Sequence, residues 1–243
     1  MLKVYSLCSG SKGNSFVIKS NDSTIMIDCG HSKKYLLNAL DSINTKIEDI
    51  NALLITHTHS DHISQLKLFN KIATYSLCDL DTQHYKLEPL INYSIANFIV
   101  TPLPLSHDAT NTCGYIIEKD QEKIVYITDT GYVKQEYIPL IRDANCYIIE
   151  FNHDVELLMQ SSRPYYLKKR ILGDTGHLCN SDGANLVREC ITSNTNTIWL
   201  AHISEDVNND DLAINTLKNL LTKKELETIK VIALKQHSII RKE

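Results

Sequence analysis

The residues with the clearest chemical potential in this sequence are three histidines and an aspartate that lie within six positions. His57, His59, Asp61 and His62 come directly after the apolar run Ala52 to Ile55. Imidazole nitrogens are good ligands for borderline divalent metals, and a carboxylate oxygen helps to neutralise the charge of the ion. In an extended loop, side chains two positions apart point the same way, so His57 and His59 are placed to share one ion. Asp61 and His62 lie past a turn and can face a second ion.

Other apolar runs also end in a polar side chain that could complete such a site. Asp28, His107, Asp129 and His202 each stand at the end of one of these runs. A single histidine or aspartate at the end of a strand is usually a cap or a hydrogen-bonded turn residue. Four of them, in order along the chain around the histidine-rich segment, favour a metal centre over four unrelated turns.

The runs that must position these side chains are short, and strands outnumber helices. We expect Ser181 with Asp182, and the segment Asn208 to Asp211, to begin two of the helices. The predicted strands are Leu2 to Leu7, Ser15 to Ile18, Thr24 to Ile27, Ala52 to Ile55, Ala73 to Ser76, Asn97 to Val100, Gly114 to Ile117, Ile124 to Ile127, Cys146 to Ile149, Thr197 to Leu200 and Val231 to Leu234, and the predicted helices are Lys33 to Leu40, Lys134 to Ile141, Ser181 to Ile191 and Asp210 to Leu221.

Composition places the chain among globular proteins. It has 243 residues, of which 43% are hydrophobic and 22% charged, so a disordered or low-complexity chain is excluded. No linker or repeat divides it, and we expect one domain over residues 1–243.

The cysteines and the hydropathy pattern indicate where the protein is located. Seven scattered cysteines without a CxxC pair indicate reduced thiols. The absence of a long apolar run argues against a membrane span or export, so we expect a cytoplasmic protein.

Taken together, these motifs resemble those of a known family. The set formed by Asp28, residues 57–62, His107, Asp129 and His202 resembles the ordered motifs of the metallo-β-lactamase superfamily. Further segments are similar to its YycJ/WalJ-type exonuclease branch, which is related to ribonuclease Z. These segments are CSGSKGNS at 8–15, LSHDATNTCGY at 105–115, ITDTGYV at 127–133, EFNHDVELL at 150–158, GHLCNSDGA at 176–184 and LAHISEDVNN at 200–209.

The resemblance implies a fold, a cofactor and an activity. The fold would be an α/β four-layer αββα sandwich, with two mixed β-sheets flanked by helices. The cofactor would be two divalent ions, zinc or manganese, with iron as a further candidate. One ion would be held by His57, His59 and His107, the other by Asp61, His62 and His202, with Asp129 between them and Asp28 orienting a ligand histidine. The activity would be 5′–3′ exonuclease digestion of duplex DNA.

For such a centre we predict hydrolysis of a phosphodiester. Two cations about 3.5–4 Å apart would lower the pKa of a bridging water and deliver it as hydroxide, and Asp61 would be a ligand of one of these ions. The leaving alkoxide still needs a proton, and His177 and His153 are the candidates for the general acid. We expect Glu150 and Asn152 to polarise or support the site, with Asn152 also a candidate for contact with the substrate.

Two segments outside the metal set are candidates for contact with nucleic acid. The loop with Ser9, Ser11, Lys12 and Asn14 has glycines, hydroxyls and a lysine suited to phosphate. The only concentrated basic segment of a chain with net charge −4 also has two adjacent tyrosines that could stack on bases. Its candidate contact residues are Arg163, Lys168, Lys169 and Arg170.

Other functions remain open at this level. The same fold could hydrolyse RNA, a cyclic nucleotide, a thioester or a lactone. A metal-containing nucleic-acid-binding module without catalysis is a further alternative.

Overall fold

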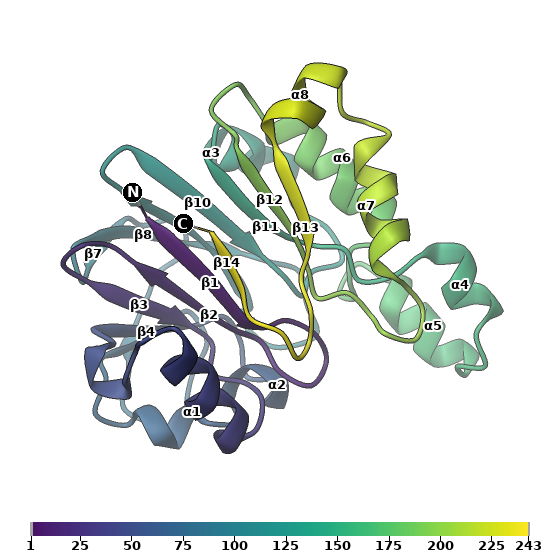
Figure 1. Ribbon diagram of the computed structural model, residues 1–243. Helices are drawn as coiled ribbons and strands as arrows, with labels where there is room; N and C mark the ends of the chain where they lie inside the picture. Colours follow the sequence, from purple (N-terminus) through teal and green to yellow (C-terminus); the bar gives the residue numbers. More distant parts are fainter. Residues whose placement is uncertain (1, 243) are drawn as a thin grey trace. The chain divides into compact units, whose positions relative to one another are not determined.

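The computed structural model describes residues 2–242, and in this part of the chain strands outnumber helices (Figure 1). The strands are β1 (Lys3–Cys8), β2 (Ser15–Lys19), β3 (Thr24–Ile27), β4 (Ala52–Ile55), β5 (Thr74–Ser76), β6 (Tyr85–Lys86), β7 (Tyr93–Ile95), β8 (Phe98–Pro104), β9 (Cys113–Lys119), β10 (Glu122–Ile127), β11 (Cys146–Glu150), β12 (Thr197–Ala201), β13 (Lys230–Ala233) and β14 (Ile240–Lys242). The helices are α1 (Lys33–Ser42), α2 (Ser60–Ile63), α3 (Ile138–Ile141), α4 (Val155–Gln160), α5 (Tyr165–Leu172), α6 (Asn180–Cys190), α7 (Asp210–Lys218) and α8 (Lys223–Thr228).

The first sheet has seven strands in the order β14-β1-β2-β3-β4-β5-β6. β1, β2 and β3 pair antiparallel through short turns, whereas β3, β4, β5 and β6 pair parallel. Every residue of β4 is buried, which is what a continuous apolar run flanked by parallel neighbours requires. The strand therefore positions the histidine-rich segment that follows it.

The second sheet also has seven strands, in the order β13-β12-β11-β10-β9-β8-β7. β7, β8 and β9 pair antiparallel, and β10 to β13 pair parallel. Because neighbouring parallel strands end at the same edge, the side chains that follow β10, β11 and β12 gather there. Two mixed sheets flanked by helices confirm the predicted fold class.

The chain divides into two compact units, each assembled from separate segments. The first contains the residues up to Pro104, Ala109–Glu122 and the residues from Lys235 onward, and the second contains Leu105–Asp108 and Lys123–Leu234. The first unit has its own apolar core, in which Leu36 and Leu40 of α1 pack with residues of β3 and β4. The expectation of one domain over residues 1–243 stays a prediction.

Two predictions about helices are wrong in detail. The expected helix from Lys134 to Ile141 is a 3₁₀ turn, Gln135–Tyr137, followed by the single turn of α3, because Pro139 has no amide hydrogen to continue a longer helix. Ser181 and Asp182 do not precede α6 but lie in its first turn, since the N-cap position is Cys179. By contrast, the side chain of Asn209 caps α7 by accepting a hydrogen bond from Leu212 N at 2.9 Å.

Among residues 2–242 there is no helix long and apolar enough to cross a membrane. The seven cysteines are all buried, and none of them forms a disulfide. This is consistent with the reduced thiols expected from their scattered spacing.

Candidate metal centre

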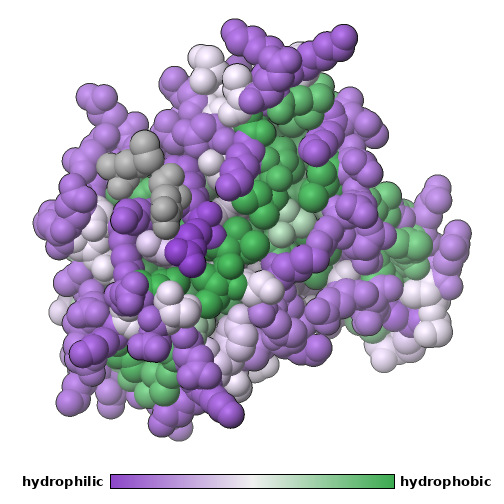
Figure 2. Space-filling model, in the orientation of Figure 1, coloured by the Kyte–Doolittle hydropathy of each residue, from purple (hydrophilic) through white to green (hydrophobic). Residues whose placement is uncertain are grey.

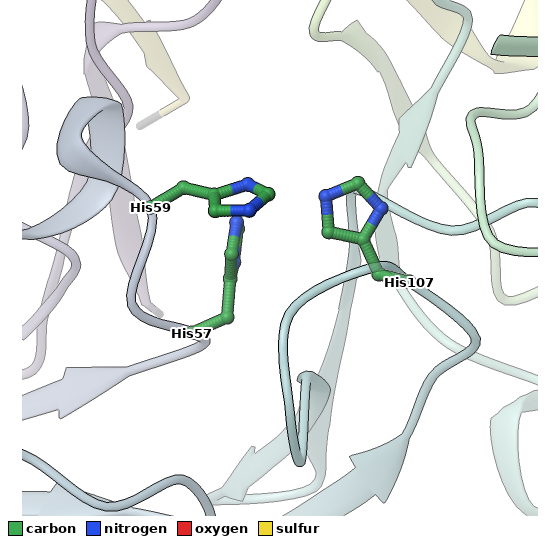
Figure 3. Close-up of side chains that lie close together, drawn as sticks. All are labelled: His57, His59 and His107. Atoms are coloured by element: carbon green, nitrogen blue, oxygen red, sulfur yellow. The ribbon is translucent and has the colours of Figure 1, made fainter. Parts of the chain in front are cut away.

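The histidine-rich segment forms a loop and the short helix α2 at the end of β4. His57 and His62 are completely buried, and His59 is half-buried. The ring of His57 lies 4.7 Å from that of His59 and 4.1 Å from that of His62, measured between centroids. Figure 3 shows the imidazoles of His57 and His59 turned toward each other from this loop, and His107 on the loop after β8. The imidazoles of His57, His59 and His62 thus converge within the first unit.

Asp28 fixes the orientation of one of these imidazoles. Its carboxylate Oδ2 accepts the hydrogen bond from His62 Nδ1 at 2.7 Å and another from Thr56 Oγ1 at 2.9 Å, while Oδ1 accepts from Thr56 N. A carboxylate that holds the proton on Nδ1 leaves Nε2 as the nitrogen that can coordinate an ion. Thr56 was not among the predicted site residues, although its position directly before the first histidine was the available signal.

Asn14, predicted to contact phosphate, instead supports the metal loop. It is completely buried, and its amide nitrogen lies 3.2 Å from Asp61 Oδ2 and 3.0 Å from His62 Nε2. Its backbone N–H also donates to Asp61 O at 2.8 Å. Ser9 of the same loop is buried too, whereas Ser11 and Lys12 are exposed. We therefore remove Asn14 and Ser9 from the set of phosphate contacts and keep Ser11 and Lys12.

In the second unit, carboxylates and imidazoles meet at the ends of three parallel strands. Asp129, Glu150, His177 and His202 each offer a ligand atom, and these atoms lie within 4.8 Å of one another. Glu150 Oε1 accepts hydrogen bonds from the Nδ1 atoms of both His177 and His202, each at 2.8 Å. Burial alone would raise the pKa of Glu150, but the two imidazoles lower it to about 2. Glu150 is thus an ionised carboxylate that sets the tautomer of both rings.

His107 is oriented in the same unit by a backbone carbonyl. Its Nδ1 donates to Gly176 O at 3.1 Å, so Nε2 is the nitrogen suited to coordination. The ring centroids of His107 and His177 lie 5.2 Å apart. Local sequence patterns do not indicate this contact, because Gly176 is 69 positions from His107.

Three of the predicted strand-end residues have backbone conformations that non-glycine residues rarely adopt. The φ angles are 56° for Asp28, 59° for Asp129 and 55° for His202. Such left-handed conformations cost roughly 1–3 kcal/mol each and gather at functional sites. Each of the three lies one or two residues after the end of a strand: Asp28 after β3, Asp129 after β10 and His202 after β12.

Asn152 supports the site, as one of its two predicted roles required, whereas His153 does not fit the predicted role of general acid. Asn152 Nδ2 donates to His202 O at 3.0 Å, so it holds the end of β12. Its contact with the substrate stays a prediction. His153 is completely buried, and neither ring nitrogen has a hydrogen-bond partner among residues 2–242. Burial lowers the pKa of His153 to about 4. Because it is neutral at pH 7, we remove it from the candidates for the general acid.

Most of the basic segment lies in α5, and Arg163 precedes this helix. Its charged side chains differ in whether they are exposed or held by other residues. Lys168 is buried, and its ammonium donates to Met159 O at 2.6 Å and Ser161 O at 2.7 Å. It therefore caps the carboxyl end of α4 and is withdrawn as a contact for nucleic acid. Arg163 pairs with Asp206 at 2.8 Å and Arg170 pairs with Asp108, whereas Lys169 is exposed.

The donor chemistry of these residues fits divalent metals. Neutral imidazoles held by carboxylates or by a backbone carbonyl, together with aspartates, are a nitrogen and oxygen donor set for zinc, manganese or iron. In the second unit, such donors lie close enough for one ion to contact several of them.

Comparison with known proteins agrees with this description. The family model described as a β-lactamase superfamily domain matches residues 23–203. The chain therefore belongs to this superfamily, and it is a metal-dependent hydrolase whose histidine and carboxylate clusters could hold metal ions. It is 35% identical to the exodeoxyribonuclease WalJ of Streptococcus pneumoniae over 237 residues, which covers 90% of this chain and 88% of WalJ.

Two further similarities extend this finding. The exodeoxyribonuclease YycJ of Bacillus anthracis is 32% identical over 233 residues, again covering 90% of this chain and 88% of the relative. The solved structure of the metallo-β-lactamase fold protein YhfI from Bacillus subtilis superposes with a TM-score of 0.77 at 17% identity, and 99% of each chain is covered. The last similarity supports the fold alone.

Proposed function

We propose that the protein is an exonuclease that hydrolyses DNA from an end with two divalent metal ions. The structural observation that carries the metal dependence is the pair of buried carboxylates, Asp28 and Glu150, that hold ligand imidazoles at 2.7 and 2.8 Å. The choice of DNA is supported by the similarity over 90% of the chain to WalJ and YycJ, both named exodeoxyribonucleases. A cytoplasmic location accords with this proposal.

For the ligands we propose the assignment that the sequence motifs imply. His57, His59 and His107 would hold one ion, and Asp61, His62 and His202 the other. Asp129 would contact both. Zinc and manganese are the proposed metals, since these donors suit both and availability decides between them.

The protein's own residues would orient the substrate and supply a proton. When bound, the ions neutralise charge on the phosphate and lower the pKa of a water molecule. Glu150 holds His177 through Nδ1, and the side chain of His177 is 20% exposed, so it can reach a substrate. We propose that His177 Nε2 donates the proton to the leaving oxygen.

Contact with the nucleic acid is proposed for the arm formed by α4 and α5, residues 155–172. The side chains of Tyr165 and Tyr166 are 74% and 75% exposed, unusually high for aromatic residues, and Lys169 lies beside them on α5. Figure 2 shows apolar side chains among the hydrophilic ones over these two helices. Exposed tyrosines next to an exposed lysine are suited to stacking on unpaired bases near a phosphate backbone.

End-labelled substrates would test the proposed activity directly. We expect the protein loaded with manganese or zinc to shorten duplex DNA progressively from the 5′ end. The Asp61→Ala variant should be inactive, because it lacks a metal ligand. His177→Ala should keep its metal content but lose about 10²- to 10⁴-fold in turnover if it is the proton donor.

The same assay separates the alternatives. RNA, a cyclic nucleotide, a thioester and a lactone are tested beside the DNA. Turnover of only one of these would replace the proposed activity, and binding of DNA without any turnover would indicate a non-catalytic module. Normal turnover by His177→Ala would remove this residue from the mechanism.

A further inference from the structure

A cavity of about 550 Å³ in the first unit lies against the metal loop. One wall includes Thr58, which stands between His57 and His59, and another includes Ile63 and Ser64, which directly follow His62. The remaining lining residues come from the segment after β5, residues 79–82, and from Leu66 and Lys67. The full lining is Thr58, Ile63, Ser64, Leu66, Lys67, Asp79, Leu80, Asp81 and Thr82.

The lining combines apolar side chains with hydroxyl groups. Ile63, Leu66 and Leu80 supply the apolar surface. Thr82 Oγ1 is buried and has no hydrogen-bond partner among residues 2–242. A buried hydroxyl left in this state is costly unless a ligand or water satisfies it, and it can both donate and accept.

The charges of the lining argue against an anionic ligand. Lys67 is its only cation, whereas Asp79 and Asp81 are both carboxylates. Asp79 is engaged by Lys86 at 2.5 Å, so Lys67 and Asp81 are the one cation and the one carboxylate of the lining that remain. A phosphate would gain nothing from this balance, but a neutral ring with polar edges would.

We propose that this cavity binds the nucleobase of the nucleotide next to the scissile phosphate. This inference rests on the proposed nuclease function and adds a subsite to it. The volume lies in the range of about 300–1,000 Å³ usual for ligand pockets. Ile63, Leu66 and Leu80 would contact the faces of the base, and the hydroxyl of Thr82 would meet its edge. Because a hydroxyl can donate or accept, the subsite would accept all four bases.

Binding to the metal-depleted protein provides a test that does not need activity. Deoxyadenosine 5′-monophosphate and deoxyribose 5-phosphate are titrated into the protein in EDTA, and binding is followed by NMR. The probes share the phosphate and differ in the base, so we expect the nucleotide to bind at least 10-fold more tightly. Leu80→Trp, which fills the cavity, should abolish this difference.

Two further variants protect the test against misfolding. Thr82→Val keeps the shape but removes the hydroxyl, and should weaken nucleotide binding several-fold. Leu37→Trp, at a surface leucine of α1 that is 37% exposed, serves as the matched control and should bind like the wild type. Equal affinity of the two probes, or unchanged binding in both cavity variants, would overturn the inference.

The activity of the metal-loaded protein distinguishes failure of the subsite from failure of the proposed function. If DNA is digested and Thr82→Val raises KM without changing kcat, both stand. If DNA is digested while the two probes bind equally, only the subsite is wrong. If no phosphodiester is cleaved, the proposed function fails whatever the probes do.

Discussion

At the scale of single residues, the site depends on groups that hold the ligands in place. Asp28 and Glu150 are buried carboxylates, and each accepts a hydrogen bond from the Nδ1 atom of a ligand histidine. Such partners fix the ring orientation and raise the basicity of the coordinating nitrogen. They also satisfy the Nδ1 donors of imidazoles that are buried away from water.

Asp28→Asn tests this role of the carboxylate. The change keeps the size of the side chain but removes its charge, so the proton on His62 Nδ1 is held less firmly. We expect metal affinity to fall about 10- to 100-fold, measured by competition with a chelating dye. Asp41→Asn, at an exposed position of α1, is the control and should leave affinity unchanged. Equal affinities in the two variants would argue against an orienting role.

The burial of His153 predicts a dependence of stability on pH. The pKa of His153 is about 4 in the folded protein, against an ordinary value of 6.5, because burial disfavours the charged form; Glu150, Asp154 and Asp182 act in the opposite direction, and His177 adds to the decrease. The unfolded chain takes up the proton first, so stability is complete above pH 6.5 and is lost as the pH falls toward 4.

A His153→Gln variant isolates this contribution. In EDTA, its free energy of unfolding should decrease less steeply between pH 6.5 and 4 than that of the wild type, by about 1.4 kcal/mol per pH unit at most. Denaturant titrations at several pH values measure the two slopes. Parallel curves would contradict the assignment of a neutral, buried His153.

At the scale of elements, the metal loop is held against the turn after β3. Gly30 N donates to Asn14 O at 3.0 Å, and a Cβ atom on Gly30 would lie only 1.7 Å from Asp61 O. This close backbone approach leaves no room for a side chain. The loops that carry Asn14 and Asp61 therefore depend on glycine between them.

Gly30→Ala should consequently damage both stability and metal binding. We expect a loss of about 1–3 kcal/mol in the free energy of unfolding, with weaker metal affinity because Asp61 is displaced. Gly173→Ala is the matched control, since its Cβ would come no closer than 3.2 Å to Lys169 O. If Gly30→Ala and Gly173→Ala lose similar amounts of stability and metal affinity, the close approach of Asp61 O is not the reason for glycine at position 30.

The arm of α4 and α5 carries the second prediction at this scale. Replacing Tyr165 and Tyr166 by alanine should weaken binding of single-stranded DNA by about 1–3 kcal/mol per stacked base, with little effect on the salt dependence. Lys169→Glu should instead lower the salt slope. Lys218→Glu, on α7, controls for charge alone. Fluorescence anisotropy at several salt concentrations measures all four proteins, and unchanged affinity in the tyrosine variant would exclude the arm.

At the scale of the whole molecule, metal binding should couple to folding. An ion that binds only the folded state stabilises it by about 4 kcal/mol at a concentration 1,000 times its Kd. For a chain of this size, we expect EDTA to lower Tm by about 8–16 °C. Calorimetry with and without metal measures the shift, and Asp61→Ala should show much less of it. Identical Tm values in the wild type would contradict a bound metal.

The predictable parts of the molecule were those with local signals. The run Ala52 to Ile55 is apolar at every position, and a strand buried on both faces requires this. His57, His59, Asp61 and His62 are close in sequence, so their proximity in the fold needed no long-range information. Short elements such as α2 and β6 were missed, because two to four residues have too little periodicity to be recognised.

The sequence by itself therefore determined the fold class and the types of residue that can bind metal. Only the tertiary structure decided which polar residues support the ligands: Asn14 contacts Asp61, Lys168 caps α4, and Asn152 holds His202. The physical reason is that a buried polar group must find a partner, and the partner is chosen by the packing of distant segments. Residue type indicates that a hydrogen bond is needed, whereas the fold decides where it goes.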